Sequence, residues 1–545
     1  MNSILLVLYY GWILSLATLI NGYEQKPLGA TRAPLKRVAI IGAGAGGSSS
    51  AYNLRKYADQ SLLDVNITVF ERASYVGGRS TTVNVFDDPA YPIELGASIF
   101  VSVNHNLVNA SRELGLMVKG AGEDRPGESE ETIGIWDGKR FVYILSDSLS
   151  WWNIAKLVWR YGLAPVRAQT LMKTTVGKFL RLYEEPLFPF KSLTAAAAEV
   201  GLLDTTSVTG EVFLEENSVS PKFSREIIQA STRVNYGQNL PVIHGLEAMV
   251  CMATDGAMAI QGGNWQIFAG MLSASEANVR LESTVRSIDR NDDGTLTITS
   301  TSAGSDMETD VFDEVVIAGP LQDSGISISP PPERIPDEIP YVELYVTLFS
   351  SPHRLSPKYF DLAGSGKTVV PETVLTTLPE DSNLPPSQSG VGPAGFWSIS
   401  TLRTVNSPGS ASSPAKHYVY KIFSPQRVTA KFVSQILGLE EEEKEGRDST
   451  VFADNSSIED LPKHHISWFH EKIWNPYPVL HPRVTFEEAV LAPNMWYTSG
   501  MESFISTMET SALMGKNVAA LMFQSWFGGE AEYDGSQTFW EKSGI

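Results

Sequence analysis

The chain has 545 residues, a length that favours two or more lobes over a single small core. Hydrophobic residues make up 43% and charged residues 19%, a globular composition that argues against a disordered chain. Acidic residues outnumber Lys and Arg by 62 to 42, and the net charge of −20 disfavours nucleic acid as a partner. Cys251 is the single cysteine, which excludes an intrachain disulfide and a cysteine zinc cluster, and we expect it to be a small buried residue.

The N-terminus is typical of a secreted chain. Residues 4–20 are almost wholly apolar and polar residues begin at Asn21, which predicts a signal peptide over residues 1–22. The apolar run has no Lys or Arg before it, so an uncleaved membrane anchor is the alternative. Candidate glycosylation sequons stand at Asn66, Asn109 and Asn455. We expect a mature luminal or extracellular protein.

The first elements of the mature chain form a predicted βαβ unit. Residues 37–41 read as a buried strand, residues 42–47 as a glycine turn, residues 48–57 as a helix and residues 65–70 as the next strand. The turn matches G-x-G-x-x-G at Gly42, Gly44 and Gly47, with Gly46 beside the last glycine. Such a turn brings backbone N–H groups and a helix N-terminus to a pyrophosphate. Glu71 ends the second strand, where a carboxylate accepts hydrogen bonds from ribose hydroxyls. The sequence therefore predicts a dinucleotide site.

Basic and aromatic residues alternate over residues 150–173, among them Trp151, Trp152, Trp159 and Tyr161. We favour a helix that lines the core or a substrate cavity. Peripheral contact with a membrane surface is the second interpretation.

Shorter elements follow. Residues 286–290 and 295–300 read as a hairpin, and residues 314–318 as a buried strand. Residues 379–414 read as loops around a strand at 395–401, and the charge cluster at 440–445 as solvated surface. A strand at 495–497 precedes helical spacing that continues to Phe523.

Four separated segments resemble the FAD-binding motifs of the amine-oxidase-like flavoproteins. They are Glu71–Arg79 with its glycine pair and arginine, Ile93–Ser98 beneath the isoalloxazine, Leu281–Val285 at the adenine, and Gly500–Glu509 at the flavin pyrimidine. The resemblance implies bound FAD, with Arg79 on the pyrophosphate. We expect the FAD to be non-covalent, because the only thiol, Cys251, lies far in the sequence from the last of these segments. The implied cofactor-binding residues are Gly42, Gly44, Gly46, Gly47, Glu71, Arg72, Gly78, Arg79, Gly96, Ala97, Ser98, Val285, Gly500 and Met508.

Within that superfamily, residues 37–525 resemble the prenylcysteine oxidase (prenylcysteine lyase) family most closely. The more particular runs are 159–162, 176–179, 233–238 and 262–264. The resemblance implies an α/β fold, in which a Rossmann-type FAD-binding domain carries a second, mixed α+β substrate domain. We expect FAD-binding parts at 36–118, 241–330 and 481–530, and substrate parts at 119–240 and 331–480.

The family resemblance also implies an activity. It is the FAD-dependent oxidation of S-farnesyl- or S-geranylgeranyl-cysteine with O2 and water, which yields a prenyl aldehyde, cysteine and hydrogen peroxide. The expected location is the lysosomal or vacuolar lumen, where prenylated proteins are degraded. Secretion from the cell is the alternative. Flavin N5 would accept the hydride, and we assign no protein base. Four residues either clamp the amino-acid end of the substrate or pack the lobe interface: Arg233, Asn235, Tyr236 and Gln238. Asn264 is a further candidate for substrate binding.

Two other functions stay open. An amine or amino acid oxidase would share the scaffold, but relatives of that kind carry a lysine near flavin N5 and residues 341–352 hold none. The other alternative is a non-catalytic FAD protein that binds a partner through its acidic surface. We expect no metal site at His464, His465 and His470, no nucleophile at Ser48–Ser50, and no obligate protein partner.

Overall fold

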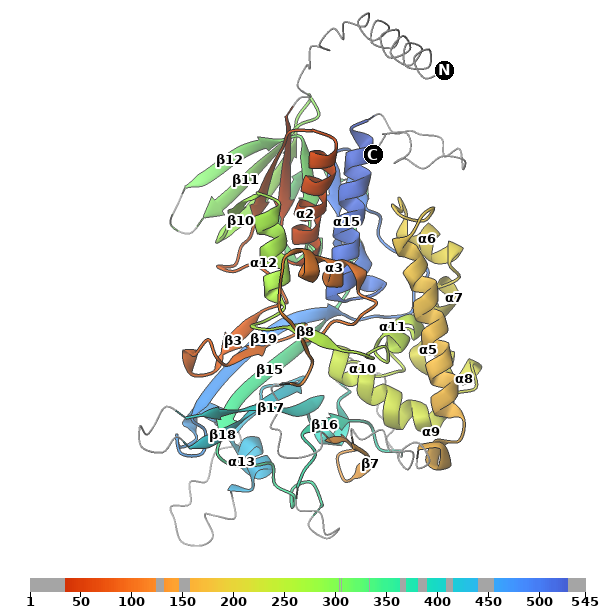
Figure 1. Cartoon of the computed structure of the whole chain (residues 1–545), viewed down its shortest axis with the longest axis vertical. Helices are drawn as coiled ribbons and strands as arrows, with labels where there is room; N and C mark the ends of the chain where they lie inside the picture. Colours follow the sequence, from red (N-terminus) through yellow and green to blue (C-terminus); the bar gives the residue numbers. More distant parts are fainter. Residues whose placement is uncertain are drawn as a thin grey trace, which may run out of the picture.

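The computed structural model shows an elongated molecule with two lobes and a column of helices along one side (Figure 1). It describes residues 35–123, 132–146, 157–302, 304, 306–332, 334–362, 369–380, 390–407, 415–439 and 455–527. The expected signal peptide, Trp151, Trp152 and the charge cluster at 440–445 lie outside the described residues.

A six-stranded sheet forms the centre of the first lobe, in the order β20-β21-β13-β1-β2-β9. Every neighbouring pair is parallel except β20 and β21. The buried residues of its inner strands are mostly apolar, because both faces of the sheet are covered, as in other parallel sheets. The strands are β1 (Lys36–Ile41), β2 (Val65–Phe70), β9 (Asn278–Arg280), β13 (Glu314–Ile317), β20 (Val490–Ala492) and β21 (Met495–Tyr497).

Two long helices lie side by side over this sheet, α2 (Ala45–Gln60) and α15 (Met508–Ser525) (Figure 1). Small residues let them approach closely: the Ser49 hydroxyl donates to the Ala512 carbonyl at 2.6 Å. The serines at 48–50 are thus buried packing residues of α2. α3 (His105–Glu113) and α12 (Trp265–Ala274) flank the pair.

The predicted hairpin is present in a four-stranded sheet of order β12-β11-β10-β14. Its strands are β10 (Ser283–Arg290), β11 (Leu296–Ser302), β12 (Met307–Phe312) and β14 (Ser327–Ser329). Two small pairs join the first lobe to the second: β3 (Thr82–Asn84) with β4 (Pro92–Glu94), and β5 (Val118–Gly120) with β8 (Met258–Ile260).

A mixed seven-stranded sheet forms the second lobe, in the order β19-β15-β18-β17-β16-β6-β7. Helix α13 (Ala430–Leu437) packs its apolar side into the core under this sheet. The predicted strand at 395–401 is the longer β17, which begins at Ser398. The strands are β6 (Thr132–Trp136), β7 (Phe141–Ser146), β15 (Tyr341–Ser351), β16 (Thr373–Thr376), β17 (Ser398–Asn406), β18 (Lys416–Ser424) and β19 (Trp468–Pro478).

The column of helices comes from the middle of the chain. Its members are α5 (Ala164–Leu180), α6 (Leu193–Glu199), α7 (Leu203–Thr206), α8 (Gly210–Glu216), α9 (Pro221–Phe223), α10 (Gln229–Tyr236) and α11 (Gly245–Val250). Residues 245–250, which the sequence assigns to an FAD-binding part, form α11, and α11 packs with α5 and α8 in this column.

The segment at 157–173 divides between core and surface. Tyr161, Ala164 and Ala168 are buried, as a helix lining the core requires. Trp159 is 91% exposed, so the favoured interpretation is wrong for this residue. Among the described residues no helix is long and apolar enough to cross a membrane.

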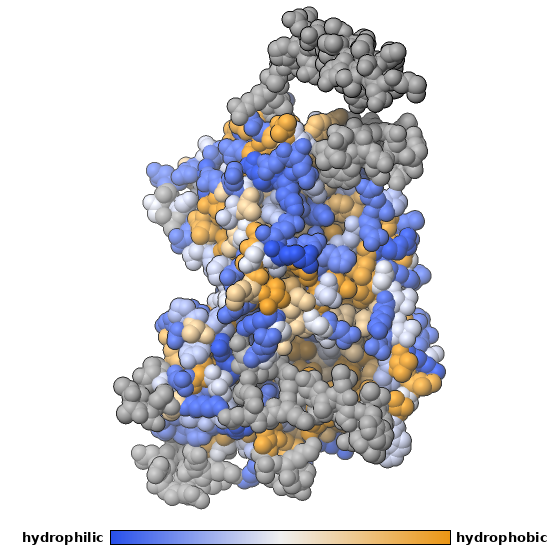
Figure 2. Space-filling model, in the orientation of Figure 1, coloured by the Kyte–Doolittle hydropathy of each residue, from blue (hydrophilic) through white to orange (hydrophobic). Residues whose placement is uncertain are grey.

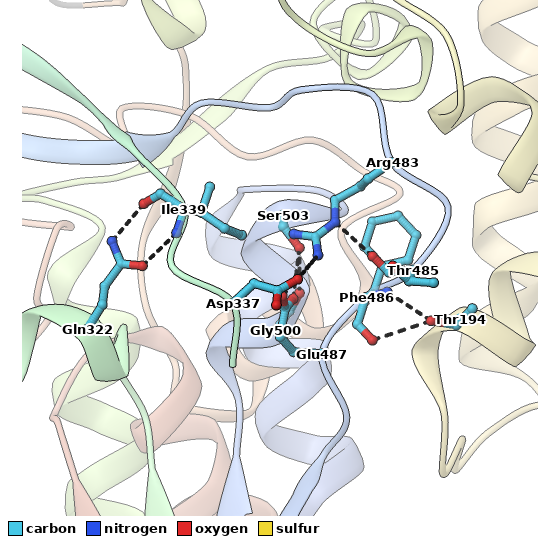
Figure 3. Close-up of polar contacts among 10 residues, drawn as sticks. All are labelled: Thr194, Gln322, Asp337, Ile339, Arg483, Thr485, Phe486, Glu487, Gly500 and Ser503. Atoms are coloured by element: carbon cyan, nitrogen blue, oxygen red, sulfur yellow. Dashed lines mark hydrogen bonds and ion pairs between the residues drawn. The ribbon is translucent and has the colours of Figure 1, made fainter. Parts of the chain in front are cut away.

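The chain returns from the second lobe to the first through residues 479–489, and Arg483 anchors this crossing (Figure 3). Its guanidinium reaches Asp337 at 3.1 Å and Glu487 at 3.0 Å, and it also donates to the Thr485 carbonyl. Glu487 in turn accepts from Ser503, just before α15. The same crossing contacts the helical column, where Thr194 and Phe486 exchange hydrogen bonds. This polar network fixes the start of the last cofactor segment relative to the other parts.

Candidate active site

The glycine turn between β1 and α2 has the conformation that its sequence predicts. Gly42 has a φ of +110°, and a Cβ there would lie 2.7 Å from the Ala318 carbonyl oxygen. A Cβ on Gly47 would lie 1.9 Å from the Gly42 oxygen, so this glycine lets the helix pack against the turn. A Cβ on Gly44 would meet only the Gly78 Cα, at 3.9 Å, and no side chain caps the start of α2. The unused N–H groups of this helix end suit a phosphate.

Glu71 lies next to this turn. One carboxylate oxygen accepts from the Ala43 N–H and the other from the Ala73 N–H, both at 2.8 Å. Each oxygen keeps a lone pair for a further donor. The carboxylate therefore holds the turn and still presents acceptors to a ribose.

A cavity of about 1280 Å³ extends from the glycine turn to the second lobe. Its walls come from α2, from the start of α15, and from β17, β18 and β19. Pockets for a single small ligand usually measure about 300–1000 Å³, so this cavity has room for a dinucleotide together with a substrate. Figure 2 shows apolar side chains gathered at the waist between the two lobes.

The start of α15 opens into this cavity. Ser506, Thr507 and Met508 line it, and the Thr507 hydroxyl caps the helix by accepting from the Thr510 N–H at 3.1 Å. A helix of 18 residues presents its positive end here, where negative charge on a reduced flavin would be stabilised.

Arg79 is fixed by an acid from the C-terminal part of the chain. Its guanidinium makes a bidentate pair with Glu502, both contacts at 2.7 Å, and donates to the Pro476 carbonyl. Tyr341 adds a hydrogen bond to the same carboxylate at 3.1 Å. Burial lowers and Glu502 raises the pKa of Arg79, with a net rise, so the guanidinium stays charged. It lines the cavity as a positioned cation.

Most of the cofactor residues expected from the sequence line this one cavity. Gly47 and Gly500 do not: Gly47 packs against Gly42, and a Cβ on Gly500 would lie 2.8 Å from the Glu487 oxygen. The cavity-lining set is Gly42, Gly44, Gly46, Glu71, Arg72, Gly78, Arg79, Gly96, Ala97, Ser98, Val285 and Met508.

The expected substrate clamp divides in the structure. Asn235 and Tyr236 line the cavity, whereas Arg233 and Gln238 are buried away from it. Arg233 donates to the Val391 carbonyl and lies over the Trp397 ring at 4.9 Å, and burial lowers its pKa to about 9. These contacts match the second interpretation, packing between lobes.

Gln238 and Asn264 also hold backbone rather than a ligand. Gln238 bridges the main chain of Pro478 and Leu480. Asn264 is fully buried, and its side chain binds the Ile260 N–H and the Ala97 carbonyl at 2.8 Å. Asn264 therefore supports the segment that was expected beneath the isoalloxazine.

The seven-stranded sheet supplies a further wall of the cavity, whose residues carry no motif in the sequence. We call it the sheet wall: Ser398, Ser400, Lys421, Phe423, Lys472 and Trp474. A Cβ on Gly96 would lie 3.2 Å from the Trp474 ring, which shows how closely this wall approaches the 96–98 segment. Residues 341–352 do lack a lysine, yet Lys421 and Lys472 reach the cavity from neighbouring strands. The missing lysine is therefore no argument against amine chemistry.

A second wall is apolar. We call it the apolar compartment: Val101, Val103, Leu107, Val176, Phe179 and Leu180, which come from α3 with the residues just before it and from α5. Cys251 is a free, buried thiol that also lines the cavity, and burial raises its pKa, so it stays neutral. Among the described residues, no group of three or more His, Cys, Asp or Glu could hold a metal ion.

Comparison with known proteins then decides the family. Residues 144–535 match the family model described as prenylcysteine lyase, and residues 40–114 match that of an NAD(P)-binding Rossmann-like domain. The chain belongs to the prenylcysteine lyase family. The recognition made from the sequence is confirmed.

Two curated relatives show how far the similarity extends. The chain is 30% identical to the farnesylcysteine lyase of Arabidopsis thaliana, over 89% of this chain and 87% of that protein. It is 28% identical to prenylcysteine oxidase 1 of Homo sapiens, over 91% and 90% of the two chains.

Solved structures with the same fold include amine oxidases. Cyclohexylamine oxidase from Brevibacterium oxydans gives a TM-score of 0.54 at 16% identity, over 91% of this chain and all of the other. Putrescine oxidase bound to putrescine gives a TM-score of 0.52 at 15% identity, over 90% of this chain and 99% of the other. The predicted fold class is confirmed.

The residues present fit FAD. The turn presents the backbone of Gly42, Gly44 and Gly46 to the cavity. Glu71 places carboxylate oxygens beside it, and α15 directs its N-terminus into the same cavity. The protein is an FAD-dependent oxidoreductase of the prenylcysteine lyase family.

Proposed function

We propose that this protein cleaves S-prenyl-L-cysteine by oxidising its thioether, with O2 and water as co-substrates and a prenyl aldehyde, cysteine and hydrogen peroxide as products. When bound, FAD accepts the hydride that leaves the allylic C1 of the isoprenoid. Water then adds to C1, and the resulting hemithioacetal releases the cysteine thiol. O2 takes up the two electrons with two protons, one from the hydride and one released when water adds to C1, and becomes hydrogen peroxide.

One observation carries this proposal: a single cavity joins the cofactor residues to an apolar compartment. The six side chains of that compartment provide a dry surface that suits a farnesyl or geranylgeranyl chain. Sulfur can stabilise positive charge at C1, so the chain's residues need to position the substrate and exclude water but need not supply a base. Membership of the prenylcysteine lyase family supports the same substrate class.

The cellular setting is also a proposal. We infer a lysosomal or vacuolar lumen, supported by the apolar N-terminal run and by the exposed side chains of Asn66, Asn109 and Asn455. A peripheral membrane contact is supported by Trp159, Leu163 and Val166, which are 91%, 60% and 54% exposed near the start of α5.

Product analysis tests the activity. Purified holoenzyme incubated in air with S-farnesyl-L-cysteine is expected to form farnesal, free cysteine and hydrogen peroxide in equal amounts. Putrescine and cyclohexylamine serve as controls and should give no peroxide. Peroxide from the amines, with none from the thioether, would move the protein to the amine oxidases.

A further inference from the structure

The reacting end of a free prenylcysteine carries an ammonium group and a carboxylate on one carbon, so its recognition needs opposite charges close together. Arg233 and Gln238 cannot supply them, because both side chains are buried away from the cavity. The cavity nevertheless brings an acid and a base together where the 94–98 segment meets the sheet wall.

The acid is Glu94, at the end of β4. Its Oε1 accepts from the Asn264 N–H at 2.6 Å, whereas its Oε2 is buried and has no hydrogen-bond partner. A buried acceptor without a partner costs free energy, and the side chain lines the cavity. Burial raises the pKa of Glu94 to about 7, against the opposing charges of Lys421 and Lys119. A ligand cation would give Oε2 its missing partner and would lower that pKa again.

The base is Lys421, on β18. Its Nζ lies 3.1 Å from the main-chain oxygen of Glu94 and 3.3 Å from the Ser98 hydroxyl. These contacts place the Lys421 ammonium over the 94–98 segment, where it binds the main chain of Glu94 and leaves the Glu94 carboxylate to another partner. In the sheet, Lys421 is opposite Ser400 on the neighbouring strand β17, and Ser400 also lines the cavity. The side chain is therefore a cation positioned at the cavity surface.

We propose that Glu94 and Lys421 together bind the zwitterionic end of the substrate, the Glu94 carboxylate accepting from the α-ammonium group and the Lys421 ammonium contacting the α-carboxylate. This inference rests on the proposed function and adds a specificity to it. The enzyme accepts a free prenylcysteine, because an N-acylated residue within a peptide offers Glu94 no cation. The prenyl chain then extends toward the apolar compartment.

Substrate analogues test the clamp group by group. S-farnesyl-3-mercaptopropionate lacks the amino group, and S-farnesylcysteamine lacks the carboxylate. Anaerobic stopped-flow reduction of the bound flavin gives the reduction rate and the Kd for each compound. Wild-type holoenzyme is expected to show a ratio of rate to Kd about 10- to 100-fold lower for either analogue than for S-farnesylcysteine, the effect of one lost charge-assisted hydrogen bond.

Variants then assign each group to its residue. Glu94→Gln keeps an oxygen that can accept from the Asn264 N–H. Its ratio of reduction rate to Kd should fall about 10- to 100-fold below wild type with S-farnesylcysteine, but less than about 3-fold with the analogue that lacks the amino group. Lys421→Met should show the same pattern with the analogue that lacks the carboxylate. Glu94→Asp and Lys421→Arg should recover part of the loss.

Two results would overturn the clamp. In the first, both analogues reduce the wild-type flavin as efficiently as S-farnesylcysteine does. In the second, each variant lowers the ratio of reduction rate to Kd by the same factor for every compound. The first comparison needs no variant, so a variant that fails to fold leaves the test intact. If no prenyl thioether reduces the wild-type flavin, the proposed function itself fails, and the clamp with it.

Discussion

Glu71 shows how one side chain can organise the cofactor site, because its two oxygens already bind the N–H groups of Ala43 and Ala73. Glu71→Ala should weaken FAD binding by about 1.5–3 kcal/mol, through loss of both the turn contacts and the ribose acceptor. Glu71→Gln keeps one acceptor oxygen and should hold FAD with intermediate affinity. Gel filtration followed by fluorescence titration of FAD measures both. An unchanged Kd in Glu71→Ala would show that this carboxylate does not contact the cofactor.

The buried side chain of Glu247 makes the stability of the fold depend on pH. It is fully buried on α11, its Oε2 accepts from the Ser506 N–H at 3.3 Å, and burial raises its pKa to about 8 from the usual 4.5. The folded protein therefore binds this proton more tightly than the unfolded chain does. The stabilising contribution is fully present below about pH 4.5 and is lost as the pH rises through about 8.

Glu247→Gln removes that titration while keeping the shape of the side chain. Its free energy of unfolding relative to wild type should rise by about 3 kcal/mol between about pH 5 and pH 8. Glu215→Gln, the same substitution at an exposed position of α8, is the matched control. Denaturant unfolding at the two pH values measures the difference. A constant difference for Glu247→Gln would mean that Glu247 is already ionised in the folded protein at the lower pH.

At the scale of elements, the contact between α2 and α15 positions both helix ends that face the cavity. A Cβ on Gly515 would lie 2.2 Å from the Gly46 carbonyl oxygen, a backbone atom that cannot move alone. Gly515→Ala should therefore destabilise the protein by about 1–3 kcal/mol and weaken FAD binding, because the two helices must separate.

Gly177→Ala is the matched control for that substitution. Gly177 also lies within a helix, α5, but a Cβ there would meet nothing within 4 Å. This variant should gain about 0.5–1 kcal/mol from helix propensity. Thermal unfolding and FAD titration of the two variants provide the comparison. Equal effects at both positions would show that the helix contact is not tight.

The same elements show what the sequence can predict. The first βαβ unit, the 286–300 hairpin and the last strand and helix are local patterns, and the structure contains all of them. The sheet wall is not local: Lys421 and Glu94 are 327 positions apart, and they meet only because the seven-stranded sheet packs against the separate β3-β4 pair. Residues 233–238 form a conspicuous run, but a helix turns Arg233 into the core and Tyr236 toward the cavity, and composition alone does not give that rotation.

At the scale of the whole molecule, the cavity depends on three separate parts of the chain. The glycine turn comes from the first lobe, the sheet wall from the second, and the apolar compartment from α3 and the column of helices. The crossing held by Arg483 ties these parts together (Figure 3). A substrate must therefore offer an apolar chain and a polar end at once, and this requirement separates a prenyl thioether from a small amine.

Anaerobic reduction of the bound flavin distinguishes a prenyl thioether oxidase from an amine oxidase in one experiment. S-farnesylcysteine, putrescine and cyclohexylamine are each mixed with holoenzyme without O2, and the loss of the oxidised flavin absorbance is recorded. The account predicts full bleaching by the prenyl thioether and none by the amines. Bleaching by an amine alone would leave the fold and the FAD site in place but contradict the substrate, and a flavin that no compound reduces would contradict catalysis itself.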